Sequence, residues 1–139
     1  MTKKELNRAR DLREQIRDIE WKIIKLRAGA EDLVPILDGL PHGNEVKSRV
    51  ENLAIKLLAA QEELSRLLEE FGRTALDLEE KINHAELDEL EKAVLTLRYV
   101  VCMNFLDIQD RLKLNDNSLF YYHRTAVKKI LKSIQVVSS

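Results

Sequence analysis

The chain has few of the residues that interrupt or cross-link a fold. Its 139 residues include one cysteine, two prolines and four glycines. A lone cysteine excludes an intramolecular disulfide, and we expect Cys102 to be a small buried apolar residue rather than a nucleophile. No segment approaches the ~20 consecutive apolar residues of a membrane span, and no apolar run follows the first five residues. We therefore expect a soluble, cytoplasmic protein without membrane contact.

Signals of catalysis are also missing. His42, His84 and His123 are spread along the chain without cysteine or carboxylate partners at metal-ligand spacing. The glutamate pairs between positions 62 and 80 fit the solvated face of a long helix better than a general acid–base pair. No glycine-rich phosphate loop is present. The sequence predicts a protein that is not an enzyme and that uses no cofactor or metal.

Charge is unevenly distributed. The net charge is −1, but residues 1–27 carry +4, residues 28–97 carry −9 and residues 98–139 carry +4. An acidic middle repels nucleic acid, so a contact with DNA is expected only near the ends.

The N-terminal region predicts two long helices with apolar seams. Thr2 and Glu5 form a capping-box pattern at the start of the first helix. The first seam runs from Ala9 to Leu26 and the second from Val46 to Phe71, both in steps of three and four. The expected loop between them, Ala28–Gly43, contains the breakers Gly29, Pro35, Gly39, Pro41 and Gly43.

These seams predict an antiparallel coiled-coil hairpin over residues 1–82, favoured by the basic first helix and the acidic second one. A helix of about 40 residues cannot bury its seam alone; it needs the first helix, a second subunit or both. We expect the hairpin to oligomerise. The seams are compatible with a hairpin monomer, a dimer or a tetramer. Trp21 lies off the first seam and is expected to pack against another helix or subunit, with exposure as the alternative.

Residues 83–139 predict a second unit of short helices. Leu87, Leu90, Val94, Leu97 and Val101 give a third seam. Asn104 is a suitable N-cap for a short helix Phe105–Lys113, and a polar turn at 115–118 precedes a final helix from about Asn117 to Ile134. The sequence leaves open whether the long helix continues through Asn83. The inner face of the final helix is predicted to consist of Leu119, Tyr122, Ala126, Ile130 and Ile134.

A basic pair of short helices with a polar second helix is typical of a helix-turn-helix that reads double-stranded DNA. Asparagine and arginine contact base edges, whereas serine, tyrosine and lysine mostly hold phosphates. The candidate DNA-binding residues are Arg111, Lys113, Asn117, Ser118, Tyr121, Arg124, Lys128 and Lys129. The alternative is a small helical bundle whose polar face is only solvated.

The order of several weak motifs resembles a known family. They are Leu97-Arg98-Tyr99, Ile108-x-x-x-Leu112, and Leu119-x-x-x-His123 followed by 126–130 (Ala-Val-Lys-Lys-Ile). Together they are similar to the DNA-reading region four of bacterial sigma factors, most of all as it occurs in phage-encoded transcription regulators of the ArpU/RinA type. The segment 39–43 (Gly-Leu-Pro-His-Gly) and the Met-Thr-Lys-Lys-Glu-Leu start also fit those relatives.

The chain departs from the pattern of these relatives at three positions. Gln109 stands where alanine is usual, at a tight helix crossing, and Lys113 stands where the turn usually has glycine. Asn115 replaces the usual capping serine, which is an acceptable exchange. Gln109 therefore puts the crossing angle in question, and Asp116 is expected to oppose phosphate approach.

The resemblance implies an all-α protein in which a sigma-region-four-like helix-turn-helix follows the hairpin. It implies a sequence-specific regulator of phage or prophage genes in a bacterial host, acting at late promoters. RNA polymerase is a further candidate partner. Two alternatives remain: a coiled-coil adaptor that binds RNA polymerase or a packaging protein without reading DNA, and a DNA-packaging recognition subunit.

Overall fold

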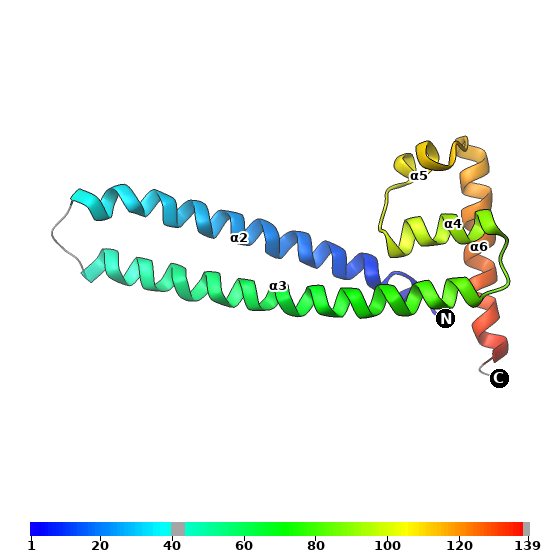
Figure 1. Ribbon diagram of the computed structural model, residues 1–139, viewed down its shortest axis with the longest axis horizontal. Helices are drawn as coiled ribbons and strands as arrows, with labels where there is room; N and C mark the ends of the chain where they lie inside the picture. Colours follow the sequence, from blue (N-terminus) through cyan, green and yellow to red (C-terminus); the bar gives the residue numbers. More distant parts are fainter. Residues whose placement is uncertain (40–43, 138–139) are drawn as a thin grey trace. The chain divides into compact units, whose positions relative to one another are not determined.

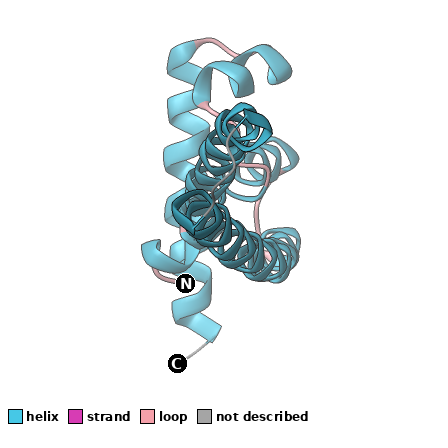
Figure 2. Ribbon diagram, turned by 90° about the vertical axis from the view of Figure 1, so that its left-hand side faces the viewer, coloured by secondary structure: helices cyan, strands magenta, loops and turns pink. Residues whose placement is uncertain are grey.

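A computed structural model describes residues 1–39 and 44–137, with side chains for 1–30 and 47–132. Every regular element in these residues is helical, which confirms the predicted all-α class (Figures 1 and 2). The elements are α1 (Lys3–Leu6), α2 (Arg8–Gly39), α3 (Asn44–His84), α4 (Glu89–Leu95), a π-helix η1 (Thr96–Val100), α5 (Phe105–Leu112) and α6 (Asp116–Val137). Within the described ranges, no helix is long and apolar enough to cross a membrane.

The chain divides into two compact units. We call Glu14–Glu69 the hairpin unit, and Met1–Arg13 with Glu70–Ser139 the composite unit. The sequence predicts a domain boundary at residue 82. Residues 1–13 and 70–82 group with the C-terminal helices, because Met1 and Leu6 from the first segment and Leu78 and Ile82 from the second are buried in the same core.

The hairpin unit consists of antiparallel stretches of α2 and α3. Its buried side chains are Ile16, Ile23, Ala60 and Leu67, all on the predicted seams. A Cβ atom added at Gly29 would lie 3.8 Å from Leu53 Cδ2, so α2 and α3 are in contact at Gly29 and Leu53. Trp21 is exposed, with Lys25 Nζ 5.5 Å from its ring centroid. Of the two possibilities for Trp21, exposure within the chain is the one observed.

The loop predicted for Ala28–Gly43 is wrong over most of its length, because α2 continues to Gly39. A glycine inside a helix costs only about 1 kcal/mol relative to alanine, so Gly29 does not have to end it. Pro35 removes a single backbone donor, and the helix extends four residues beyond it. Residues 40–43, including His42, lie outside the described residues.

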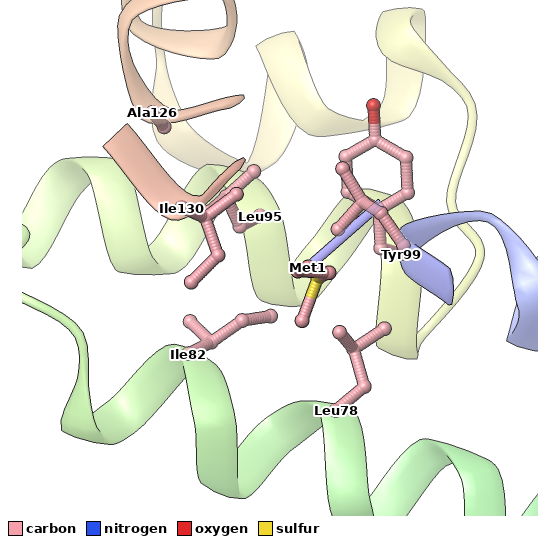
Figure 3. Close-up of a cluster of buried hydrophobic side chains, with 8 residues drawn as sticks. Met1, Leu78, Ile82, Leu95, Tyr99, Ala126 and Ile130 are labelled. Carbon is pink, nitrogen blue, oxygen red and sulfur yellow. The ribbon is translucent and has the colours of Figure 1, made fainter. Parts of the chain in front are cut away.

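The composite unit is built around a core to which distant parts of the chain contribute. Met1 and Leu6 bury against Leu78 and Ile82 of α3, and Figure 3 shows Met1 among these side chains. The remaining buried members are Leu95, Tyr99, Ala126 and Ile130. The N-terminus is fixed locally as predicted, because the Thr2 hydroxyl accepts a hydrogen bond from the Glu5 N–H at 3.2 Å.

α3 ends at His84, which answers the question left open at Asn83. A short connection leads to Asp88, the N-cap of α4. Asp88 Oδ1 accepts the Glu91 N–H at 2.8 Å, and Glu91 Oε1 accepts the Asp88 N–H at 3.1 Å. This reciprocal capping box starts α4 at Glu89, so Leu87, the first residue of the third predicted seam, precedes the helix.

The third predicted seam fails at its C-terminal end. Val101, expected to point inward, is exposed, whereas Tyr99 is buried. The cause is the π-helix Thr96–Val100, whose wider turn contains an extra residue and so rotates the following positions around the axis. Cys102 then adopts a left-handed conformation with φ 66° and is half-buried rather than buried.

Candidate nucleic-acid interface

The segment from α5 through a short turn to α6 is held by side-chain caps. Asn104 Oδ1 accepts the Asp107 N–H at 2.8 Å and starts α5, as predicted. Lys113 ends α5 in the left-handed conformation, with φ 56° and ψ 46°. Asn115 Oδ1 accepts the Ser118 N–H at 2.8 Å, so it caps the final helix as the sequence predicted. α6 begins at Asp116, one residue before the predicted start.

One face of α6 holds the helix on the composite unit. Leu119 is buried with Val94 and Ile108, and Ala126 and Ile130 are buried in the larger core. Tyr122 packs at the edge as a half-buried ring. The predicted inner face is therefore confirmed for these positions. Ile134 lies outside the residues whose side chains are described.

The opposite face of α6 carries four of the eight predicted DNA-binding residues. Asn117, Tyr121, Arg124 and Lys128 are all exposed, and their spacing of four, three and four places them along one line. Ser118 is half-buried, and its backbone N–H is used in the cap. The structure thus exposes a continuous polar and cationic line opposite the buried one.

Two further predicted cations precede α6 in the chain. Arg111 lies in the last turn of α5 and Lys113 in the turn that follows, and both are exposed. Glycine adopts this left-handed conformation more easily than lysine does. A lysine at this position accepts about 1 kcal/mol of backbone strain.

Lys129 differs from the other predicted site residues. Its Nζ lies 2.8 Å from Glu91 Oε1, and the side chain of Glu91 is only 2% exposed. The hydrogen bond with Glu91 is the main reason that the pKa of Lys129 is raised. Lys129 therefore joins α6 to α4, and its charge is largely compensated within the protein. Sequence spacing could not reveal this pair, because its members are 38 positions apart.

Gln109 and Asp116, the two residues expected to weaken the interface, bind each other. The Gln109 amide donates to Asp116 Oδ1 across the turn. The larger side chain at the position of the usual alanine thus forms a bridge between α5 and the first turn of α6. One oxygen of the Asp116 carboxylate is engaged by this amide, but its negative charge remains.

An aromatic and cationic network lies behind the turn. The Arg98 guanidinium lies 4.0 Å from the centroid of the Phe105 ring, and its Nη1 donates to the Met103 carbonyl at 3.2 Å. Tyr99 Oη and His123 Nε2 are 2.7 Å apart, and the two rings are stacked. The motif comparison included Arg98, Tyr99 and His123, but spacing alone did not show that they form one network.

Burial sets the ionisation of this network. It lowers the pKa of His123 and raises that of Tyr99, and the nearby charges of Arg98 and Arg10 lower both. Burial is also the main cause of the lowered pKa of Arg98, to which Arg10 contributes. His123 therefore stays neutral at a lower pH than an exposed histidine. The network packs against α6 on the side away from its exposed polar line.

Exposed aromatic and apolar side chains also occur on α5 and α6. Phe120 is 56% exposed beside the polar line, and Leu106 of α5 is 73% exposed. The Phe105 and Phe120 rings are in tilted contact at 5.9 Å between centroids. In the part of the chain that the structure describes, no cluster of three His, Cys, Asp or Glu side chains could hold a metal ion.

Comparison with protein families matches residues 42–131 to one described as "Protein of unknown function (DUF1492)". This match spans more than half of the chain. The chain belongs to the DUF1492 family. The matched range contains α4, α5 and most of α6, and so nearly all of the candidate interface. No curated protein and no solved structure matches the chain.

Proposed function

We propose that this DUF1492 protein binds double-stranded DNA and reads its sequence with the N-terminal half of α6 in the major groove. One observation carries the proposal: Asn117, Tyr121, Arg124 and Lys128 form an exposed line directly opposite the buried face of the helix. A recognition helix needs both faces, one to fix its position and one to reach bases and phosphates.

The residue types suggest a division of work along this line. Arg124 and Asn117 have the donor and acceptor geometry that distinguishes base edges. Lys128, Arg111 and Lys113 supply charge for phosphates on either side, and the hydroxyls of Tyr121 and Ser118 add phosphate contacts. Lys129 has a different role in this proposal: it keeps α6 on α4 through Glu91.

We further propose that the protein regulates transcription of phage or prophage genes in the bacterial cytoplasm, with RNA polymerase as a possible partner. This part rests on the resemblance to phage regulators with a sigma-region-four-like helix-turn-helix. Its mechanism is recognition without catalysis. Oligomerisation through residues 1–82 would set the spacing between two DNA half-sites.

A second candidate function is supported by the long helices. Ile55, Leu58 and Leu76 of α3 are each more than half exposed. Exposed apolar side chains of this size favour a protein contact. An adaptor that binds a protein partner through α3, without reading DNA, would use this surface and leave α6 only solvated.

Fluorescence anisotropy with a random-sequence duplex separates the two functions. The DNA-binding proposal expects binding at low salt that weakens steeply towards physiological salt, because phosphate contacts release counterions. Replacing both Arg124 and Lys128 by alanine should abolish this binding while circular dichroism stays unchanged. No binding by the wild type at low salt would favour the adaptor.

The matched control is the double replacement Arg49→Ala and Lys56→Ala. These two cations are exposed on α3, so the control removes the same formal charge without touching α6. We expect this control variant to bind DNA within about threefold of the wild type, although both double variants change the net charge by the same amount. Equal losses in both variants would show that only total charge matters.

A further inference from the structure

Besides its buried seam, α3 carries a second line of uncharged residues, which we call the stripe. Charged residues are frequent elsewhere along the helix. The first half of the stripe is Val50, Ala54, Leu58 and Gln61, which are all exposed. Steps of three and four place them on one side of the helix. Val50, counted in the second predicted seam, is exposed with this group instead of packing against α2.

The same helical spacing continues through Ser65, Leu68, Gly72 and Leu76. Leu58, Leu68 and Leu76 are 58%, 48% and 69% exposed. Burying one such leucine contributes about 1.5–3 kcal/mol. Covering the three leucines of the stripe would therefore stabilise an assembly of this chain with a partner. Scattered exposed leucines are ordinary, but a helix-long uncharged line is a candidate contact surface.

Gly72 gives an independent indication. A Cβ atom added at Gly72 would meet nothing within 4 Å, so the chain's own packing does not require glycine there. Glycine inside a helix costs about 1 kcal/mol relative to alanine. A glycine with open space above it is suited to the close approach of another backbone. A second helix lying on the stripe would make that approach.

The order of residues along the stripe identifies the second helix. Read from either end, the stripe is large, small, large, polar, polar, large, small, large, and the steps read 4, 4, 3, 4, 3, 4, 4 in both directions. The two halves are equidistant from Glu63. A palindromic surface of this kind is complementary to itself when two copies run antiparallel about a two-fold axis.

We propose that the stripe is the dimer interface of this protein, formed by the α3 helices of two copies packed antiparallel and centred at the level of Glu63. In this register one copy's Leu58 lies on the other's Leu68, and one copy's Ala54 lies on the other's Gly72. Each large residue meets a large one, and the small pair lets the two backbones approach. Gln61 meets Ser65 on either side of the two-fold axis.

Charge complementarity supports the same register. The next positions outward along the stripe, three residues beyond each end, are Lys47 and Glu79, and both are exposed. In the antiparallel pair the lysine of one copy faces the glutamate of the other, twice. A parallel pair would instead place like charges opposite each other at both ends, which is unfavourable. This inference concerns α3 alone and does not rest on DNA binding.

Sedimentation velocity of the full chain tests the interface. The wild type should sediment as a dimer at micromolar concentration. Leu58→Asp should raise the dimer dissociation constant by about a hundredfold or more, because each interface loses two buried leucines. Ile55→Asp is the matched control, since Ile55 is 66% exposed on α3 but lies off the stripe. Circular dichroism of both variants should match the wild type.

Three sedimentation results would overturn the proposal. They are a wild type that stays monomeric at the highest concentration, equal effects of the two aspartate variants, and a Leu58→Asp variant that remains a dimer. If Leu58→Asp lost helicity, Gly72→Leu would replace it, because the isolated chain has space there and only a close partner would be displaced.

Disulfide trapping tests the register. In a Cys102→Ser background, one preparation carries Leu58→Cys and another carries Leu68→Cys. Mixing the two should yield a disulfide-linked dimer under mild oxidation, and neither alone should do so. Ten residues along a helix separate like positions by about 15 Å, beyond the reach of a disulfide. Efficient cross-linking of each preparation by itself would indicate a parallel pair and contradict the palindromic register.

Discussion

The two units use the same kind of helix in opposite ways. In the hairpin unit, two long stretches of α2 and α3 bury few side chains between them, and large apolar residues such as Trp21 and Leu58 stay exposed. In the composite unit, short helices enclose two apolar clusters and leave mainly polar and cationic residues on the outer side of α6. We infer that the exposed stripe of α3, which begins in the hairpin unit and ends in the composite unit, is covered by another protein copy, and that the outer side of α6 binds a ligand of opposite charge.

The largest expected effect is the loss of stability caused by a substitution in the core of the composite unit. Leu119→Asp places a carboxylate beside Val94 and Ile108, where Leu119 is 1% exposed. We expect a loss of about 3–5 kcal/mol or more in the free energy of unfolding, enough to unfold α5 and α6. Urea titration monitored by circular dichroism measures it, with exposed Leu106→Asp as the control.

The helicity that the Leu119→Asp variant retains tests whether the two units unfold separately. If the units are separate, the long helices of the hairpin unit should keep most of their signal when α5 and α6 unfold. Loss of the entire helical signal in a single transition would show one cooperative unit instead.

A smaller effect in the opposite direction is expected at the turn. Lys113→Gly relieves the left-handed conformation and should raise the free energy of unfolding by about 0.5–1 kcal/mol. The same change removes a cation from the proposed interface, so the variant should bind duplex DNA more weakly although it is more stable. Denaturation and anisotropy on one preparation measure both. Stronger DNA binding would argue against a phosphate contact at this position.

The smallest expected effect is a dependence on pH. The pKa of His123 is lowered in the folded protein, chiefly by burial, so the unfolded chain binds a proton more readily. Stability is therefore fully present above the unfolded pKa of about 6.5 and decreases as pH falls below it. His123→Gln should flatten the dependence of thermal stability on pH between about 7 and 5. An unchanged slope would place the responsible proton elsewhere, and His84, exposed at the end of α3, serves as the control position.

Local signals in the sequence predicted much of this architecture. Short-range chemistry at Thr2, Asn104 and Asn115 specified three helix starts, because a cap depends on residues within one turn. Apolar periodicity likewise predicted the buried faces of Leu67, Leu119 and other seam positions.

The misses have non-local causes. Gly29 and Pro35 are breakers by propensity, but α2 passes through both. The π-helix before Val101 depends on how α4 packs, which no window of sequence contains. Likewise, Lys129 looks like any other exposed lysine until the fold places Glu91 beside it.

The salt dependence of DNA binding tests the central claim most directly. We would measure the slope of the logarithm of the binding constant against the logarithm of salt concentration for the wild type and Lys128→Ala, with Lys56→Ala as control. If α6 binds DNA, we predict a steep negative slope that becomes shallower by about 1 in Lys128→Ala and is unchanged in the control. A wild-type slope near zero, or equal slopes in all three proteins, would contradict a DNA interface on α6.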